Sequence, residues 1–299
     1  MKKRTLGNSS LQISEISLGC MSLPATIREA KPIVEAALDA GVNYFDTADL
    51  YDRGENERII GELLKPVRQN VFIATKVGNR WNEGKEGWHW DASPEHIENG
   101  LKESLKRLKT DYVDVYQLHG GTTEDSWHEI IDTFERLKKQ GYIREYGISS
   151  IRPSVFKPFL QNSQAISNMM QYNLLDRRPE EWFDDIASTG ASVVTRGSIA
   201  KGLLTNEWEN RLEKSNSYLS YTKEELKEAL NTLQNHYEDI HALSLAYNLS
   251  HPVIASTVIG ASSKQQFLEN LKAYEKAQSI QDFAAVQRIT KKDLYTDHR

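Results

Sequence analysis

The sequence has few cysteines and no long apolar segment. Its 299 residues include a single cysteine, Cys20, which excludes an internal disulfide framework and a multi-cysteine metal site. No run of about 18 apolar residues exists that could cross a bilayer as a helix. The basic residues at the N-terminus are not followed by an apolar segment, so we expect no secretory signal. A single thiol suits a reducing compartment, and we therefore expect a cytoplasmic protein.

The sequence also lacks a strong excess of charge. Its formal net charge is −5, which gives no electrostatic reason to expect nucleic acid or a membrane as a partner. Hydrophobic residues make up 39% and charged residues 26%, as in globular proteins with a substantial core. The chain contains no linker, low-complexity tract or internal repeat, so we expect one domain over 1–299. It carries no signal for a particular oligomeric state, and no metal site is expected.

Short apolar runs alternate with amphipathic segments along the chain. The runs that predict strands are 16–19, 43–48, 71–78, 112–119, 145–150, 167–173, 192–198 and 255–260. Several are almost continuously apolar, which is typical of parallel strands covered on both faces. The segments that predict helices are 28–41, 55–65, 93–109, 126–141, 153–161, 180–189, 223–249 and 264–276. Eight strands alternating with eight helical regions predict an α/β protein with the (β/α)8 TIM barrel, although an open doubly wound sheet has a similar alternation.

Three segments depart from this alternation. Residues 4–14 predict a β-hairpin around Gly7-Asn8-Ser9, which we expect to close the N-terminal end of the barrel. The polar segment 203–222 lies between the seventh and eighth strands, and long loops of this kind are usually lids or disordered. Residues after 276 are expected to form a C-terminal extension.

Chemically useful side chains follow neighbouring strands. Asp46 and Tyr51 follow the second predicted strand, Lys76 ends the third and His119 ends the fourth. Active sites of TIM barrels lie at the carboxyl ends of the strands, so these groups should share one face. A buried lysine needs a partner, and Asp46 is the natural one. Each group has an ordinary alternative: Asp46 and Lys76 as a structural ion pair, and His119 as a core histidine.

Together these groups suit proton transfer to a carbonyl oxygen. A nearby ammonium favours the phenolate form of a tyrosine, which makes the phenol a better proton donor. A histidine could orient the substrate oxygen or share the proton. Because no amino acid supplies a hydride, reduction of the carbonyl carbon would need a cofactor.

Three motifs resemble those of the aldo-keto reductase family: 43-NYFDTADLY-51, 73-IATKVG-78 and 111-DYVDVYQLH-119. The resemblance extends over essentially the whole chain. It implies a catalytic tetrad of Asp46, Tyr51, Lys76 and His119, with Tyr51 as the general acid. It also implies reduction of a small-molecule aldehyde or ketone to an alcohol, with NADPH as the cofactor and NADH less favoured.

The resemblance further implies a cofactor site. It assigns Ser149, Ser150 and Gln171 to the nicotinamide carboxamide, 197–204 to the pyrophosphate and 260–270 to the adenosine ribose. Arg196 replaces the usual stacking aromatic, and a planar guanidinium can also stack. The nearest cation to Ser262 is Lys264, so we expect a weaker preference for NADPH than is usual. The expected cofactor residues are Gly19, Met21, Asp46, Ser149, Ser150, Gln171, Arg196, Gly197, Ser198, Ile199, Lys201, Gly202, Gly260, Ser262, Lys264, Gln266, Glu269 and Asn270.

Some features keep an alternative interpretation. The segment 79–90 contains Trp81, Trp88 and Trp90, which predict a wall of the substrate pocket beside Tyr51 and His119, or indoles that pack this loop onto the barrel. Residues 260–270 also read as an ordinary capped surface helix. The rival functions are a nicotinamide-nucleotide-binding regulatory or sensor subunit with little turnover, and a barrel hydrolase or isomerase that uses no nucleotide.

Overall fold

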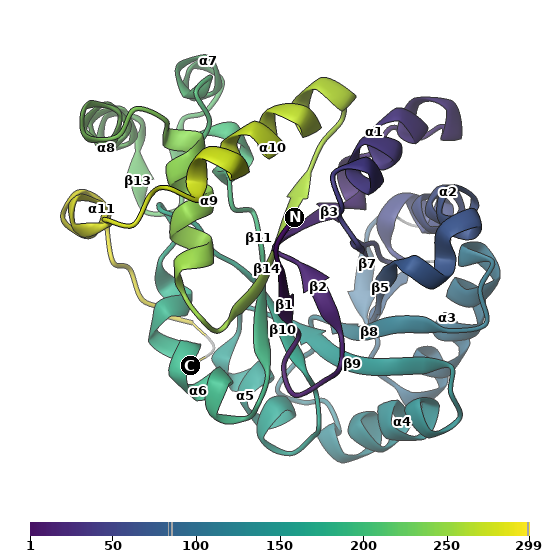
Figure 1. The fold of residues 1–299 in the computed structure, drawn as a ribbon. Coiled ribbons are helices and arrows are strands. Elements are labelled where there is room, and N and C mark those ends of the chain that lie inside the picture. Colours follow the sequence, from purple (N-terminus) through teal and green to yellow (C-terminus); the bar gives the residue numbers. More distant parts are fainter. Residues whose placement is uncertain (83, 85, 298) are drawn as a thin grey trace.

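The centre of the molecule is a closed barrel of eight parallel strands with helices around it (Figure 1). The computed structural model describes residues 1–82, 84, 86–297 and 299. The barrel strands are β3 (Ile16–Gly19), β4 (Tyr44–Asp46), β5 (Phe72–Val77), β8 (Val113–His119), β9 (Ile143–Ser149), β10 (Ser167–Gln171), β11 (Ser192–Arg196) and β14 (Ile254–Gly260). Consecutive barrel strands are neighbours, and β14 pairs with β3 to close the ring. The expected (β/α)8 barrel is confirmed.

Most of the outer helices bury one apolar face, whereas α9 is buried almost all round. They are α1 (Ile27–Asp39), α2 (Glu55–Leu64), α3 (Pro94–Leu108), α4 (Trp127–Lys139), α5 (Pro153–Gln161), α6 (Phe183–Ser188), α8 (Lys223–His236), α9 (Ile240–Ser250) and α10 (Lys264–Ala277). In α1, the buried Ile33, Val34 and Ala37 recur every three or four residues, which places them on one face. Gly41 and Gly141 follow α1 and α4 with φ of +81°, the left-handed conformation expected for glycines that end helices.

One predicted helix is in fact two. The segment 223–249 was expected to be a single helical region, but α8 and α9 are separate helices. Tyr237 leaves the helical conformation with φ −130° and ψ 128°. The side chain of Asp239 then accepts a hydrogen bond from the backbone N–H of Ala242 at 3.0 Å, which begins a new helix. The chain can therefore change direction between α8 and α9.

The N-terminal hairpin closes one end of the barrel, as predicted. Its strands β1 (Lys3–Thr5) and β2 (Gln12–Ser14) are antiparallel. Leu6, Leu11 and Ile13 are buried and pack in one cluster with residues of the barrel strands, including Val115 and Met169. The hairpin thus covers apolar side chains that would otherwise face water at the amino ends of the strands.

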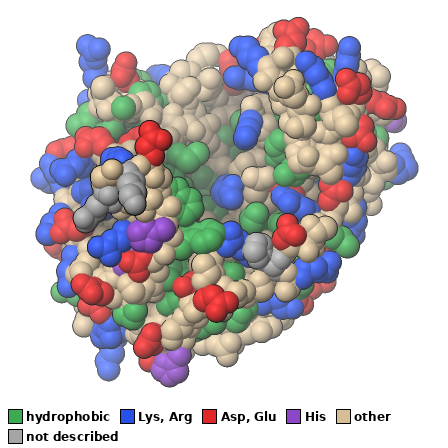
Figure 2. All heavy atoms as spheres, turned by 180° about the vertical axis from the view of Figure 1, so that it is seen from behind, with side chains coloured by type: hydrophobic (Ala, Val, Ile, Leu, Met, Phe, Trp, Pro, Cys, Tyr) green, Lys and Arg blue, Asp and Glu red, His purple; other side chains and the backbone are tan. Residues whose placement is uncertain are grey.

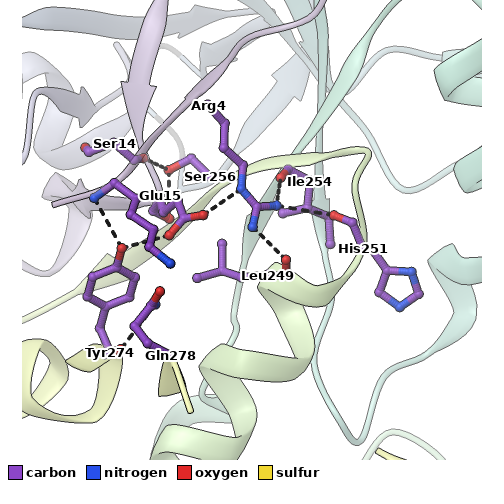
Figure 3. Close-up of polar contacts among 10 residues, drawn as sticks. Arg4, Ser14, Glu15, Leu249, His251, Ile254, Ser256, Tyr274 and Gln278 are labelled. Carbon is purple, nitrogen blue, oxygen red and sulfur yellow. Dashed lines mark hydrogen bonds and ion pairs between the residues drawn. The ribbon is translucent and has the colours of Figure 1, made fainter. Parts of the chain in front are cut away.

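A polar cluster ties the hairpin to the last helices (Figure 3). Arg4 Nε donates to Glu15 Oε1 at 2.7 Å, and Tyr274 OH donates to Glu15 Oε2 at 2.7 Å. The Arg4 guanidinium also donates to the carbonyl oxygens of Leu249, at 2.8 Å, and Ile254, at 2.9 Å. Leu249 lies in the last turn of α9, where carbonyl groups lack helical partners. These contacts hold the hairpin, α9 and α10 together.

The remaining segments outside the regular alternation of strands and helices contain short helices and strands. Residues 203–222, which we expected to be a lid or a disordered loop, contain α7 (Trp208–Glu213), β12 (Ser217–Tyr218) and β13 (Tyr221–Thr222). The third βα-loop contains the antiparallel β6 (Asn79–Trp81) and β7 (Trp88–Trp90); its residues 83 and 85 lie outside the described residues. The C-terminal extension contains α11 (Ala284–Ile289). No helix in the described part of the chain is long and apolar enough to cross a membrane.

Candidate active site

Lys76 is fully buried at the end of β5 and has three polar partners. Its Nζ donates to Asp46 Oδ2 at 2.7 Å, to the Thr47 carbonyl oxygen at 2.8 Å and to Tyr51 OH at 3.2 Å. Asp46 reaches Lys76 because β4 and β5 are adjacent strands. Burial by itself would lower the pKa of Lys76, but the charge of Asp46 and the contact with Tyr51 outweigh it and raise this pKa. The lysine therefore stays an ammonium beside the phenol.

An unusual backbone segment directly follows Tyr51. Asp52, Arg53 and Gly54 have φ values of 48°, 55° and 87°, all in the left-handed region. Non-glycine residues adopt this conformation at a cost of about 1–2 kcal/mol each, so surrounding contacts must hold it. The Arg53 guanidinium lies 4.3 Å from the ring centre of Trp81, which provides one such contact. The segment turns the chain sharply between the end of β4 and α2.

His119 meets Tyr51 edge to face. The centres of the two rings are 6.2 Å apart, and the ring planes form an angle of 89°. Burial lowers the pKa of His119 to about 3, and the positive charges of Lys76 and Arg196 contribute to this shift. The imidazole is therefore neutral at physiological pH. Its Nδ1 is buried, and none of the described residues supplies a hydrogen-bond partner for that atom.

A cavity of about 640 Å³ opens above these groups at the carboxyl ends of the strands. We call it the catalytic cavity; the face that carries it is hollowed, with hydrophobic and basic side chains at the hollow (Figure 2). Tyr51, His119 and Trp88 line it as predicted. The expected cofactor residues that line it are Gly19, Met21, Asp46, Ser149, Ser150, Gln171, Arg196, Gly197, Ser198, Ile199, Lys201 and Gly260.

A second cavity continues from the first. This outer cavity has a volume of about 730 Å³ and shares Ser22, Ile199, Lys201 and Gly260 with the catalytic cavity. The expected cofactor residues that line only the outer cavity are Gly202, Ser262, Gln266, Glu269 and Asn270. The two cavities together form one groove from the tetrad to the first turn of α10.

The outer cavity has the features of an anion site. Ser262 lines it directly before α10, whose N-cap is Ser263 and whose first turn contains no acidic residue. The positive end of a helix dipole and free backbone N–H groups favour a phosphate there. Lys201 and Arg211 add positive charge to the lining, which also contains three acidic residues, Glu207, Asp239 and Glu269. A cavity that joins an anion site to a tetrad of polar groups fits an elongated phosphate-bearing cofactor.

Three predicted residues line neither cavity, and one of them, Lys76, is instead buried against Asp46 and Tyr51. Lys264, expected to be the cation near a 2′-phosphate, is outside both linings, whereas Arg211 and Lys272 line the outer cavity. Trp81 is also outside both linings, whereas Trp88, its register partner in the hairpin, and Trp90 line the catalytic cavity. Trp81 therefore fits the interpretation that it packs the loop onto the barrel, and not the interpretation that it forms a wall of the substrate pocket.

Arg152 and Arg211 were missed by the sequence analysis. Arg152 lines the catalytic cavity. It lies two residues after the predicted pair Ser149-Ser150, so its position after the fifth strand could have indicated a place in the site. Arg211 lies on α7 in the segment 203–222, whose conformation the composition did not indicate.

Gln171 and Arg196 lie side by side. They are register partners on β10 and β11, and Arg196 Nη1 donates to Gln171 Oε1 at 3.2 Å. Gln171 Nε2 donates to Asp176 Oδ2 at 2.9 Å. The amide of Gln171 is thus fixed in orientation at the edge of the catalytic cavity, with the guanidinium beside it.

A closed barrel with a buried Asp–Lys–Tyr group and a long groove at the carboxyl ends of its strands defines a barrel enzyme with room for a nucleotide cofactor. Residues 15–291 match the family model described as the aldo/keto reductase family, and the chain belongs to this family. The resemblance read from the three motifs is confirmed. The family comprises oxidoreductases of carbonyl compounds that use nicotinamide cofactors.

Similar proteins agree with this assignment. The chain is 48% identical to the "Uncharacterized oxidoreductase YqkF" of Bacillus subtilis (strain 168) over 100% of both chains. The solved structure of aldo-keto reductase AKR11C1 from Bacillus halodurans in its holo form is similar with a TM-score of 0.92 and 47% identity, over 100% of this chain and 99% of that chain. A "Probable voltage-gated potassium channel subunit beta" from Oryza sativa subsp. japonica is 27% identical over 92% of each chain.

Proposed function

We propose that residues 1–299 form one domain that reduces aldehydes or ketones to alcohols with NADPH, and that Tyr51 is the general acid. The observation that carries this proposal is the position of Lys76 Nζ, 2.7 Å from Asp46 Oδ2 and 3.2 Å from Tyr51 OH. A reduced nicotinamide, when bound, supplies the hydride that the protein itself lacks. The chain's own residues then have to bind the carbonyl group and protonate its oxygen.

Tyr51 gives its phenolic proton to the carbonyl oxygen. The Lys76 ammonium stabilises the phenolate that remains, and Asp46 keeps the ammonium charged and fixed. Charge thus develops beside a preorganised cation in a buried site, where such stabilisation is large. His119, which is neutral, can donate one hydrogen bond to the same oxygen without competing as the acid.

The groove offers separate places for the two ends of the cofactor. Ser149, Ser150 and Gln171 line the catalytic cavity and would hold the nicotinamide end. Ser262 and Arg211 line the outer cavity and would hold the adenosine end. We base the preference for NADPH over NADH on Arg211, because a guanidinium can bind the 2′-phosphate with two hydrogen bonds. In this proposal Arg211, and not Lys264 as expected from the sequence, binds the 2′-phosphate.

The rival function is a nucleotide-binding regulatory or sensor subunit. The relative from Oryza sativa is named as a probable channel subunit, and a subunit of a larger assembly is the kind of protein that this alternative describes. A sensor needs the groove but has no use for a phenol hydrogen-bonded to a buried lysine. The complete tetrad therefore favours turnover.

The experiment is a fluorescence titration with NADPH and NADH, followed by an assay of NADPH oxidation with a panel of aldehydes and ketones. We expect NADPH to bind more tightly, by about tenfold, which corresponds to about 1.4 kcal/mol. We also expect turnover of at least one carbonyl class. Tight binding without turnover would support the sensor function, and absence of binding to either nucleotide would support a barrel enzyme of another kind.

A further inference from the structure

One part of the catalytic cavity is not shared with the outer cavity and contains the guanidinium of Arg152, which has no role in the proposed function. Gly120, Trp88, Trp90 and Arg152 line this part, which we call the substrate rim. Arg152 lies directly before α5 and is half-buried. Its guanidinium carbon is 4.1 Å from the ring centre of Trp90, so the planar group covers one face of the indole. The rim is therefore an aromatic wall with a guanidinium on it.

The substrate rim adjoins the tetrad. Gly120 follows His119, and a Cβ atom at Gly120 would lie 2.6 Å from Trp90 Nε1. Gly120 also has φ +95°, so both its conformation and the close approach of the indole favour glycine there. This approach brings Trp90, and Arg152 with it, next to the strand end that carries His119. A substrate with its carbonyl oxygen at Tyr51 would extend over this surface.

The positive charge of Arg152 is not neutralised within the part of the chain that the structure describes. No carboxylate there lies within 4.0 Å of its guanidinium, and its one side-chain hydrogen bond goes from Nη1 to the Gly121 carbonyl oxygen at 3.3 Å. Asp46 is the single acidic residue among the described lining of the catalytic cavity, and Lys76 already pairs with it. Most of the five N–H donors of Arg152 are thus available to a ligand.

We propose that the preferred substrates are aldehydes or ketones that carry a carboxylate, and that Arg152 binds this carboxylate. The proposal rests on the proposed function and names its substrate class. A guanidinium matches a carboxylate with two parallel charge-assisted hydrogen bonds. Trp88 and Trp90, 43% and 36% exposed, offer an apolar surface for the carbon skeleton between the two groups. Arg152 is a specificity-determining residue in this assignment.

The other cations of the catalytic cavity are placed differently. Arg196 donates to Gln171, on the strands assigned to the nicotinamide end, and Lys201 lines both cavities. Arg152 lines only the catalytic cavity and stacks on the hairpin of the third βα-loop. It therefore lies on the surface left for the substrate.

The test compares 3- and 4-carboxybenzaldehyde with their methyl esters, which keep the size of the aldehyde and remove the charge. The quantity measured is the ratio of kcat/KM for acid over ester, with NADPH saturating. We expect the wild-type protein to favour the acid of at least one isomer. Arg152→Leu should lower the ratio by about 10- to 100-fold, the range for a hydrogen bond to a charged group. The loss should appear mainly in KM for the acid, while kcat/KM for the ester stays nearly unchanged.

Two further variants make the result specific. Arg80→Leu removes an exposed arginine that pairs with Asp91 on the same hairpin but does not line the cavity, and it should leave the ratio unchanged. Arg152→Lys should restore part of the ratio, because it keeps the charge without the planar fork. Melting temperatures show whether each variant is folded.

Two outcomes would overturn the proposal. Equal kcat/KM for acid and ester in the wild-type protein would exclude a carboxylate site, and the proposed reduction of carbonyl compounds would stand. Equal losses for acid and ester in Arg152→Leu would mean that Arg152 only packs against Trp90. If the wild-type protein turned over neither acid nor ester, nor any aldehyde or ketone of the panel, the proposed function itself would fail and this inference with it.

Discussion

At the scale of single residues, three of the buried polar atoms without a described partner lie near the tetrad. Asp49 Oδ1, Asn79 Oδ1 and His119 Nδ1 are buried, and no described residue gives any of them a hydrogen bond. A buried polar atom without a partner costs about 1–3 kcal/mol, so these three atoms do not stabilise the fold. Asn79 and His119 line the catalytic cavity, where a bound ligand can supply the missing hydrogen-bond partner.

Asp49 gives a prediction about pH. Burial raises the pKa of Asp49 to about 8 from 3.8, with the nearby Glu57 adding to the shift. A carboxyl whose pKa is raised on folding favours the folded state below the unfolded pKa, and this contribution is lost as the pH rises through the folded value. The wild-type protein should therefore lose stability through this group between about pH 4 and pH 8.

Asp49→Asn should remove that dependence, because the amide does not titrate. Relative to wild type, the free energy of unfolding of the variant should increase between about pH 4 and pH 8 and then become constant. Urea unfolding at several pH values across this range measures the difference. A difference that stays flat with pH would show that Asp49 is ionised in the folded protein throughout.

At the scale of elements, left-handed backbone follows two strands at the site. One stretch is 52–54, directly after Tyr51, and the other is 200–202, in the loop that lines both cavities. Strained backbone is typical of functional loops because surrounding contacts must impose it. Glycine ends both stretches, and at Gly54 the space is occupied as well: a Cβ atom would lie 2.7 Å from Arg107 Cδ and Nε.

Gly54→Ala should therefore destabilise the protein and damage the site. Arg107 pairs with the buried Glu57 at 2.6 Å, and Glu57 accepts a hydrogen bond from Thr75, the neighbour of Lys76. Gly141→Ala is the matched control, because Gly141 also has positive φ but has no atom within 4 Å of its Cβ position.

Gly141→Ala should lower the free energy of unfolding by about 1–2 kcal/mol, the cost of left-handed backbone alone. Gly54→Ala should lower it by about 1–3 kcal/mol more, the range for overpacking, and should also lower kcat. Denaturant unfolding and steady-state kinetics of both variants measure these effects. Equal losses of stability with unchanged kcat would mean that Arg107 moves aside freely.

The elements were predictable where local pattern determines them. The apolar runs at 16–19 and 255–260 correspond to β3 and β14, because barrel strands are buried on both faces and must be apolar. The break between α8 and α9 was missed because both sides of it have helical periodicity, and only residues 237–239, which end in the capping residue Asp239, separate the two helices. Such a break depends on where each helix packs, which periodicity does not encode.

At the scale of the whole molecule, the two ends of the barrel have different tasks. The N-terminal hairpin closes the amino ends of the strands, and the tetrad and both cavities lie at the carboxyl ends. The topology explains why Asp46, Lys76 and His119 could be predicted, since each ends or follows a strand of the same ring. Arg152 lines the catalytic cavity from the loop between β9 and α5, and Arg211 lines the outer cavity from α7; the placement of both segments depends on tertiary contacts.

The central claim is that Tyr51 protonates the carbonyl oxygen while the rest of the barrel holds the cofactor. The most direct test is Tyr51→Phe, measured by steady-state kcat with the best aldehyde and by NADPH fluorescence titration. We expect kcat to fall by about 10²- to 10⁴-fold, the contribution of a general acid, and the Kd for NADPH to stay within about twofold. Tyr142→Phe, at a tyrosine that is 45% exposed and outside both cavities, should change neither value. Unchanged turnover in Tyr51→Phe would contradict the account.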